Sequence, residues 1–472
     1  MTSKLSWRLG ASFGAVLAML GTVPAMADTT TDFGRATVTL GGFLAEESVY
    51  RSRSESADIG SSYSGVPFSN AQTAHVSENR FTARQSRLSL LVQGDVDSDT
   101  HIAMWNEFDF LGAANTANSN ESNSYNLRIR NMYATIDWDS LGLQLLAGQN
   151  WSLVTLNSHG ITPRNEVSPA TIDAQYVVGF NWTRQPQIRI TKNWNKEFWL
   201  AVSVENPQTT FAGNAAAASG ITVNNVKAGG SQLNSTTNYS LNHIPDFVGK
   251  IAWEPVIDGA QPLHMEVLGI YRSFYDRVNV AAVNGLGLAA ASYNNNTNGG
   301  GVGGSITWQA IPKTLDLQAT AMTGSGIGRY GSGSLPDTTF RPDGSLAPAQ
   351  ETTFLGGVTL HATPLLDFYV YGGQEAEKRK TFVTGAVTTG LGSPTLNLSG
   401  CLVEGGACSP NIETENQVAA GLWWRAYQGK FGSFRMGLQY SYTHLSSFSG
   451  VGGIRPTTDD SMVFTSIRYY PF

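Results

Sequence analysis

Apolar and polar residues alternate with a period of two along much of the chain. In the segment 431–444 the apolar set and the polar set that alternates with it are Phe434, Met436, Leu438, Tyr440 and Tyr442, and Ser433, Arg435, Gly437, Gln439, Ser441 and Thr443. The segments 197–205 and 414–427 show the same alternation. This pattern predicts β-strands with one apolar and one polar face.

The pattern predicts sixteen strands, and their connections alternate in length. Short turns such as DVDSD and NWNK are followed by long Asn/Gly/Ser-rich stretches such as LGAANTANSNESNS. A meander of this kind places all long loops on one side. The expected strands are 35–46, 80–94, 100–110, 125–138, 142–150, 178–191, 197–205, 246–254, 263–277, 301–310, 314–323, 352–362, 365–377, 414–427, 431–444 and 459–472.

Alternating loop lengths favour a membrane barrel over a soluble sandwich or propeller. In lipid every backbone group has to be paired, so the sheet closes, with short periplasmic turns and long outer loops. A sandwich gives no reason for loop lengths to alternate. We therefore predict an all-β fold, a transmembrane antiparallel β-barrel of sixteen strands, with eighteen as the next expected number.

The first 27 residues have the pattern of a secretory signal peptide, with Lys4, Arg8, an apolar run from Leu9 to Val23 and an A-x-A site at 25–27. We expect residues 28–472 to form one barrel domain in the outer membrane of a Gram-negative bacterium. The chain has 30 Lys and Arg against 36 Asp and Glu, and loss of the leader makes it more acidic, so nucleic acid is not an expected partner. The low charged fraction of 14% and the 51 glycines suit a sheet protein with long polar loops.

Cys401 and Cys408 are the only cysteines in the sequence. In an oxidising compartment a short-loop disulfide is favoured over two free thiols. The seven histidines show no metal-ligand spacing. We expect no metal site and no cofactor.

Charged residues on the polar face are candidates for the lining of a water-filled lumen, because a sixteen-stranded barrel is too wide for side chains to fill. Charges in such a lumen select ions and small solutes. Alternation gives as basic candidates Arg87, Arg128, Arg130, Arg189, Arg272, Arg425 and Arg435, and as acidic candidates Glu107, Asp109, Glu205, Glu266, Asp316 and Asp367.

The connection 150–177 differs from the other long loops because it carries apolar residues such as Trp151, Leu153 and Val154 beside Arg164 and Glu166. Apolar loop residues need a surface to pack on, and the barrel wall offers one. We predict that this connection folds inward as a constriction loop, which would place Arg164 and Glu166 at the pore. The alternative is an outer loop packed on its neighbours or on a trimer partner.

Six short motifs between Arg80 and Pro207 resemble the DcaP-like family of trimeric outer-membrane porins. They are RQSRLSL (Arg84–Leu90), NEFDF (Asn106–Phe110), RIRNMY (Arg128–Tyr133), LLAGQNWS (Leu145–Ser152), RQPQIRIT (Arg184–Thr191) and ENP (Glu205–Pro207). The resemblance covers about a quarter of the chain. It implies a homotrimer of sixteen-stranded barrels that admits small, often anionic solutes such as carboxylates, with constriction arginines drawn from Arg84, Arg87, Arg128, Arg130, Arg184 and Arg189.

The resemblance has two limits. Members of that family can carry a coiled-coil stretch before the barrel, whereas only about eight residues, Asp28–Arg35, precede the first expected strand. Beyond Pro207 no motif matches, so Arg272, Arg425 and Arg435 rest on alternation alone.

The alternation is out of step between Arg130 and Met132. Arg128 and Arg130 share a face that Met132 and Ala134 then occupy. A β-bulge between the two halves would restore the pattern. The two arginines would then face the lumen, either to contact solute or to pair with Glu107 and Asp109.

We expect a porin, a passive diffusion channel for small hydrophilic anionic solutes, without enzymatic activity. One alternative is a carbohydrate-selective porin, since Trp105, Trp199 and Trp423 have lumen-facing parity and sugars stack on aromatic rings. A barrel hydrolase is a remote alternative, with His101 near Glu107 and Asp109 as its best acid-base candidate. A gated transporter would need a plug domain, for which we expect no room before Ala36.

The aromatic C-terminus resembles the recognition signal of the barrel-assembly machinery. Tyr470 and Phe472 fit that signal, and Phe464 and Met462 would continue the apolar, lipid-facing side. Arg468 interrupts it. Either its side chain snorkels to the interface or a bulge at Tyr469–Tyr470 turns it into the lumen.

Overall fold

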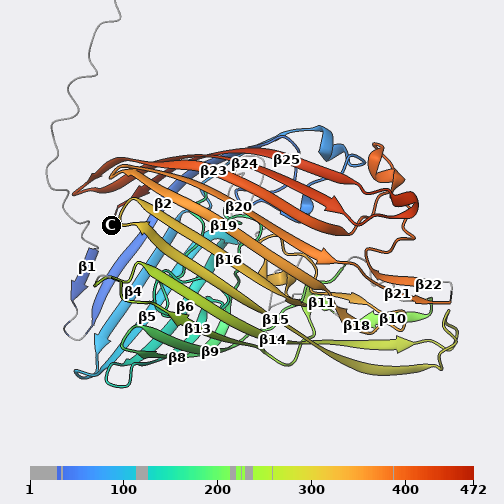
Figure 1. The fold of residues 1–472 in the computed structure, drawn as a ribbon, viewed down its shortest axis with the longest axis horizontal. Coiled ribbons are helices and arrows are strands. Elements are labelled where there is room, and N and C mark those ends of the chain that lie inside the picture. Colours follow the sequence, from blue (N-terminus) through green and yellow to red (C-terminus); the bar gives the residue numbers. More distant parts are fainter. Residues whose placement is uncertain are drawn as a thin grey trace, which may run out of the picture.

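The structure, a computed structural model, describes residues 29–32, 34, 36–112, 126–212, 219–224, 226–228, 238–257, 259–385 and 387–471. Within these residues sixteen antiparallel strands form a closed barrel, as the sequence predicts (Figure 1). They are β2 (Thr37–Arg51), β4 (Arg87–Asp95), β5 (Thr100–Gly112), β6 (Asn126–Trp138), β7 (Leu143–Trp151), β8 (Arg184–Trp194), β9 (Phe198–Glu205), β13 (Asp246–Trp253), β14 (Leu263–Val280), β15 (Ala291–Ile311), β16 (Leu315–Ser325), β19 (Gln350–Thr363), β20 (Leu366–Lys378), β23 (Ile412–Gly429), β24 (Gly432–Ser447) and β25 (Thr457–Tyr470).

The first and last strands close the barrel. Residues 44–51 of β2 pair antiparallel with residues 462–469 of β25, so neither strand is left as a free edge. On its other side β2 pairs with both β3 (Glu78–Thr82) and β4, which are two parts of one strand interrupted at residues 83–86.

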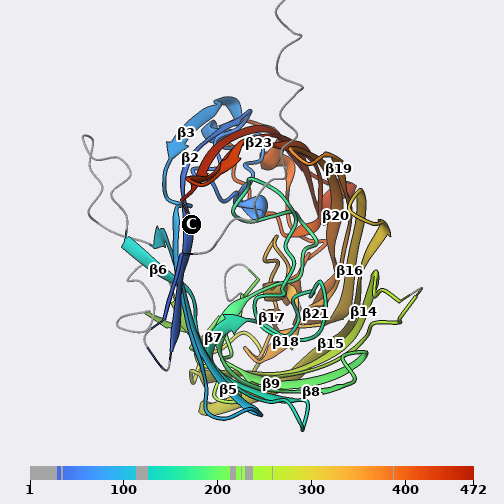
Figure 2. The same cartoon turned by 90° about the vertical axis from the view of Figure 1, so that its left-hand side faces the viewer.

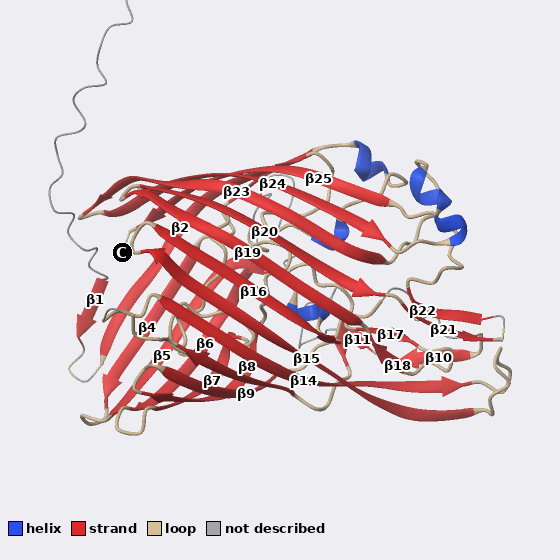
Figure 3. Ribbon diagram, viewed as in Figure 1, coloured by secondary structure: helices blue, strands red, loops and turns tan. Residues whose placement is uncertain are grey.

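Smaller elements lie in the loops and at the rims. The short strands are β1 (Thr29–Asp32), β10 (Ile221–Asn224), β11 (Val226–Ala228), β12 (Asn238–Ser240), β17 (Thr338–Phe340), β18 (Leu346–Pro348), β21 (Lys380–Thr384) and β22 (Val387–Leu391). The helical elements are single 3₁₀ turns in loops, at Tyr63–Gly65, Gln72–His75, Gly328–Tyr330, Ser399–Leu402 and Val451–Gly453 (Figure 3). In the part of the chain that the structure describes, no helix is long and apolar enough to cross a membrane.

Tight turns lie at one end of the barrel and long connections at the other. Residues 139–142, 195–197 and 430–431 are examples of the tight turns, whereas residues 326–349 and 379–411 are long connections. The C-terminal strand ends at the tight-turn end (Figure 1). This arrangement follows from an even number of antiparallel strands in a meander.

The strands alternate between an exposed apolar face and a buried polar face. On β9, Phe198, Leu200 and Val202 are exposed on the outside, whereas Ser203 and Glu205 are buried inside. The same division holds on β24. The outer apolar face is the one that a membrane barrel turns to lipid.

The predicted bulge on β6 is confirmed. Glu107 pairs with Asn131 and Phe108 pairs with Ile129, so Arg130 is the extra residue. The bulge turns Arg128 and Arg130 to the same face as Asn131 and Tyr133. The Gln149 amide donates to the carbonyl oxygens of Ile129 (2.9 Å) and Arg130 (3.3 Å), which the bulge leaves outside the regular ladder.

The predicted orientation of the last strand is wrong. Met462 and Phe464 are fully buried on the inner face, where they pack with Ile59 and Ile172 from two loops inside the barrel. Apolar residues are tolerated there because loops, and not water, cover this part of the wall. The inner face therefore also includes Arg468 and Tyr470.

Arg468 faces the lumen without a bulge, since β24 and β25 pair in continuous register up to Tyr470. Its guanidinium donates to Glu47 Oε1 at 2.9 and 2.6 Å. Tyr470 contacts Phe43 inside the barrel, with ring centroids 5.0 Å apart. Phe472 lies outside the described residues, and a role of the C-terminus in assembly stays a prediction.

Candidate channel constriction

Residues 152–183, between β7 and β8, run through the interior of the barrel (Figure 2). Their backbone N–H groups donate to lumen-facing side chains of distant strands. Leu153 donates to Glu205 on β9 (2.9 Å), and Ile172 donates to Gln439 on β24 (2.6 Å). Residues 152–183, here called the inner segment, are thus attached to opposite parts of the wall.

Apolar side chains hold the inner segment in place. Near its start, Leu153, Val154 and Ile161 pack with Trp199 on β9 and with residues of β13, β14 and β16. Near its end, Tyr176, Val177 and Phe180 pack with wall residues such as Tyr369 on β20. Tyr371 on β20 belongs to this cluster, and Trp182 packs against it.

Three arginines of the wall surround Tyr176 of the inner segment. Arg87, Arg130 and Arg184 come from β4, β6 and β8. Burial acts to raise the pKa of the Tyr176 phenol, but the guanidinium groups of Arg130, Arg184 and Arg87 outweigh burial and lower the pKa. Guanidinium groups from three strands of the wall thus act together on this phenol.

Arg128 and Arg130 are neutralised by wall carboxylates. Arg130 contacts Glu107 at 2.5 Å and Asp109 at 3.1 Å, whereas Arg128 contacts Asp109 at 2.9 and 2.7 Å. The structure thus places these two arginines in ion pairs with Glu107 and Asp109. Asp109 is buried between its two partners.

Arg87 and Arg184 are less fully paired. The nearest carboxylate oxygen to Arg87, on Glu107, is 4.0 Å away. Arg184 stacks on Trp151 and Trp182, with its guanidinium carbon 5.0 and 5.2 Å from the ring centroids. Among the described residues no carboxylate lies at ion-pair distance from Arg184.

The other candidate residues lie apart from this group. Arg84 binds Asp58 of the first long loop, and Arg189 donates to the carbonyl of Trp151, where the inner segment begins. Arg164 lies over Trp105, with 5.9 Å between guanidinium carbon and ring centroid. Glu166 accepts from Asn150 and from the Arg164 backbone.

Three further arginines extend the basic surface toward the tight-turn end. Arg425, Arg435 and Arg468 share a cavity of about 310 Å³ with Arg87 and Arg130. Arg425 pairs with Asp367 (2.6 Å), and Arg435 lies 4.5 Å from the ring centroid of Tyr470. Alternation predicts Arg425 and Arg435 on this face. For Arg468 it predicts the lumen only with a bulge, because the apolar Met462 and Phe464 indicate the opposite parity; the structure places Arg468 there without one.

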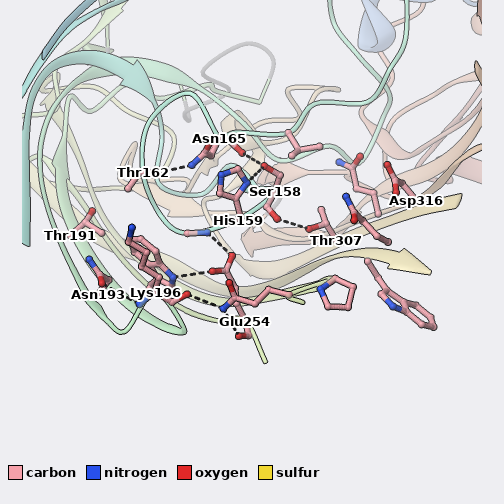
Figure 4. Close-up of a pocket in the computed structure, with 18 of the residues that line it drawn as sticks. Ser158, His159, Thr162, Asn165, Thr191, Asn193, Lys196, Glu254, Thr307 and Asp316 are labelled. Atoms are coloured by element: carbon pink, nitrogen blue, oxygen red, sulfur yellow. Dashed lines mark hydrogen bonds between the residues drawn. The ribbon is translucent and has the colours of Figure 1, made fainter. Parts of the chain in front are cut away.

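A larger cavity of about 1070 Å³ lies between the inner segment and the tight-turn end (Figure 4). Glu254 accepts from the Gly160 backbone (2.6 Å) and from the Trp199 indole (3.1 Å), and so joins the inner segment to the wall. Further lining residues are Ser158, Thr162, Asn165, Thr191, Asn193, Lys196 and Thr307. Apolar residues such as Leu143, Trp308 and Leu317 also line the cavity, so its wall offers both hydrogen-bonding and apolar surface.

Each of the three lumen-facing tryptophans contacts the inner segment. Arg164 lies over Trp105, Gly160 lies against Trp199, and the Trp423 indole donates to the carbonyl of Ala170 (2.8 Å). Their rings therefore do not form a continuous free surface along the lumen.

The two cysteines and His101 lie at opposite ends of the barrel. Cys401 and Cys408 form a disulfide in a loop at the long-loop end, with Cα atoms 4.7 Å apart. His101 is hydrogen-bonded to Asp95 (2.6 Å) and Asp139 (3.3 Å) near the tight turns. Of the residues described, no group of three or more His, Cys, Asp or Glu could hold a metal ion.

The structure is similar to the outer membrane channel DcaP of Acinetobacter baumannii, with a TM-score of 0.63 and 17% identity over 93% of this chain and 99% of that chain. Salmonella typhi OmpF in complex with daunomycin (TM-score 0.46, 10% identity, 93% of this chain and 99% of that chain) and Pseudomonas putida OprB (0.46, 10%, 91% and 94%) are more distant. No family model and no curated protein matches the sequence. The chain has the fold of an outer-membrane porin of Gram-negative bacteria, and the resemblance carried by the six motifs is confirmed at the level of the fold.

Proposed function

We propose that this protein is a passive diffusion channel in the outer membrane of a Gram-negative bacterium and that it favours small hydrophilic anions such as carboxylates. The tight-turn end then faces the periplasm. The observation that carries the proposal is the excess of arginine beside the inner segment. Glu107 and Asp109 neutralise Arg128 and Arg130, which leaves Arg87 and Arg184 with positive charge available to a solute.

Guanidinium groups suit this task because they bind carboxylates through two parallel N–H donors and stay charged. Arg435 adds a third such group in the cavity of about 310 Å³ toward the tight-turn end, where it stacks on Tyr470. An anion could therefore move from one arginine to the next. Weak successive contacts of this kind favour passage over tight binding.

Planar-bilayer recordings test the proposal. Purified protein should conduct and should pass chloride in preference to potassium in a salt gradient. The double variant Arg87→Gln/Arg184→Gln should shift the reversal potential toward cations. A matched control is Arg277→Gln, since Arg277 contacts Asn294 on the exposed hairpin between β14 and β15.

Two outcomes would contradict the proposal. A folded barrel that does not conduct would exclude a diffusion channel. A double variant with the same reversal potential as the Arg277→Gln control would show that Arg87 and Arg184 do not set the selectivity.

The carbohydrate alternative has less support, because the inner segment contacts Trp105, Trp199 and Trp423. Liposome swelling compares the two solute classes, and we expect faster swelling with dicarboxylates than with neutral sugars of similar size.

A homotrimer is also part of the proposal, because the six motifs resemble those of a family of trimeric porins. Native mass spectrometry of the detergent-solubilised protein tests it by mass.

A further inference from the structure

Four glutamates form a cluster on the inner wall near the long-loop end. Glu351 on β19 pairs directly with Glu377 on β20, and Glu375 on β20 pairs directly with Glu415 on β23. All four are buried, with at most 4% of their surface exposed. We call these four residues the glutamate cluster. Like charges at directly paired positions destabilise a sheet.

Few hydrogen-bond donors reach the carboxyl oxygens of the glutamate cluster. Among the described residues, only Oε1 of Glu375 accepts hydrogen bonds, from the backbones of Gly179 (2.8 Å) and Gly333 (2.9 Å). The other carboxyl oxygens of the cluster, including both of Glu351, Glu377 and Glu415, are buried without a partner there. An ionised carboxylate in such surroundings is strongly disfavoured.

Outside the glutamate cluster, the charged groups with the largest effect on its ionisation are two further acidic residues. Negative charge on Asp337 disfavours the ionisation of Glu351 and Glu377, and negative charge on Glu55 disfavours the ionisation of Glu415. Asp337 is paired with Arg272, and Glu55 lies 3.5 Å from Arg51. The nearby Arg329 is directed to Asp246 and Gln185. Within the described residues no Lys, Arg or His forms an ion pair with the cluster.

Residues 326–349, between β16 and β19, cover the glutamate cluster from the lumen side and are mostly buried. A Cβ on Gly331 or Gly333 would collide with the carboxyl groups of Glu375 or Glu415, and a Cβ on Gly328 would lie 2.8 Å from Glu351 Oε2. The segment therefore rests directly on the carboxyl groups. The segment is also attached elsewhere, for example by the Arg272–Asp337 pair, by the bond from the Tyr330 hydroxyl to Asp246 (2.8 Å) and by the bond from the Trp182 indole to the Ser332 hydroxyl (2.9 Å).

We propose that residues 326–349 form a proton-sensitive lid. The lid stays on the wall while the glutamate cluster is protonated, and it detaches from the wall as the carboxyl groups ionise. Two backbone N–H groups can stabilise one negative charge, on Glu375. Each further ionisation adds a charge next to a like charge at a site without a counter-ion. The covered state is thus favoured at low pH and lost as the pH rises.

Hydrogen exchange of the full-length protein in detergent, followed by mass spectrometry, tests this proposal. We expect residues 326–349 to exchange faster as the pH rises, after correction for the intrinsic rate. If opening releases one proton, the ratio of open to covered lid should rise about tenfold per pH unit. The double variant Glu351→Gln/Glu415→Gln should keep the segment protected at the pH where it opens in the wild type.

Glu413→Gln is the matched control. Glu413 lies on β23, as Glu415 does, but it pairs with Arg455 at a partly exposed position. It should open like the wild type. The proposal is overturned if protection of residues 326–349 does not depend on pH, or if the double variant opens like the control. It is also overturned if calcium chloride at constant pH protects the segment and EDTA releases it, because a bound cation would then replace the protons.

Discussion

Two parts of the lumen wall carry charge in opposite ways. The basic wall, formed by β4 to β8, mixes arginines with Glu107 and Asp109, so that most of its charges have a partner and the surplus is positive. The acidic wall, formed by β19, β20 and β23, holds the glutamate cluster with no basic partner among the described residues. The first wall can keep its charges ionised beside water, whereas the second has to be neutralised by protons.

Both walls arise from the same alternation of polar and apolar residues. They differ in what covers them. On the basic wall the inner segment leaves a cavity beside Arg87 and Arg130. On the acidic wall residues 326–349 lie on the carboxyl groups. Selectivity and opening of the channel would thus depend on different strands.

The largest expected effect on stability comes from loss of Arg130 in the basic wall. Arg130→Met should lower the free energy of unfolding by about 3 to 5 kcal/mol, because Glu107 and Asp109 would lose a buried partner. Urea unfolding in detergent, followed by tryptophan fluorescence, measures this loss. Arg128→Met is the control. Since Arg128 is more exposed than Arg130, its loss should cost less, and equal losses would contradict our description of the buried pairs.

A pH effect should come from Glu55, a loop residue near the acidic wall. Burial, opposed by Arg51, raises the pKa of Glu55 from 4.5 to about 8. Glu55 then keeps its proton in the folded protein at pH values where the unfolded chain has lost it. Its contribution to stability is complete below pH 4.5 and falls by roughly 1.4 kcal/mol per pH unit until the pH passes about 8.

Urea unfolding at pH 5 and pH 8 measures this dependence. The wild type should lose stability between the two values, and Glu55→Gln should lose less. If the variant has the same pH dependence as the wild type, Glu55 is ionised in the folded protein and Arg51 outweighs burial.

The strands could be predicted from the sequence because their alternation and turns are local signals. Where two signals conflict, the prediction is wrong. Residues 178–183 resemble the start of a strand, but Val178 and Phe180 pack inside the barrel, and β8 begins at Arg184. Residues 291–300 resemble a loop because of their Asn and Gly content, yet they pair with the extended end of β14.

The two walls could be predicted only in part. Arg87, Arg128 and Arg130 follow from alternation and the bulge, since each lies within one strand. The glutamate cluster could not be found in this way, because it depends on which residues of β19, β20 and β23 lie opposite each other. The register of β19 against β20 depends on the irregularity between His361 and Thr363 beside their turn, and β20 and β23 are joined by the long connection 379–411, so alternation alone does not give either register.

A smaller effect, of opposite sign, should come from the acidic wall. Glu415→Gln should raise the free energy of unfolding by up to about 1 kcal/mol at pH 8, because it removes a carboxyl group that faces Glu375. Urea unfolding measures the gain. A loss of stability comparable to that of Arg130→Met would show that Glu415 has a counter-ion, and the contrast between the two walls would disappear.

The smallest effect should come from Glu413, two residues before Glu415 on β23. Its carboxylate contacts Arg455 at 2.8 Å, and both side chains remain a third to a half exposed. Exposed pairs of this kind contribute between about 0 and 1 kcal/mol, so Glu413→Gln should lower the free energy of unfolding slightly or not at all. The same substitution two residues apart then gives a gain at Glu415 and a small loss at Glu413. If unfolding shows a gain at both positions, the general negative charge of the chain destabilises the barrel, and the buried pairing of Glu375 with Glu415 is not the cause.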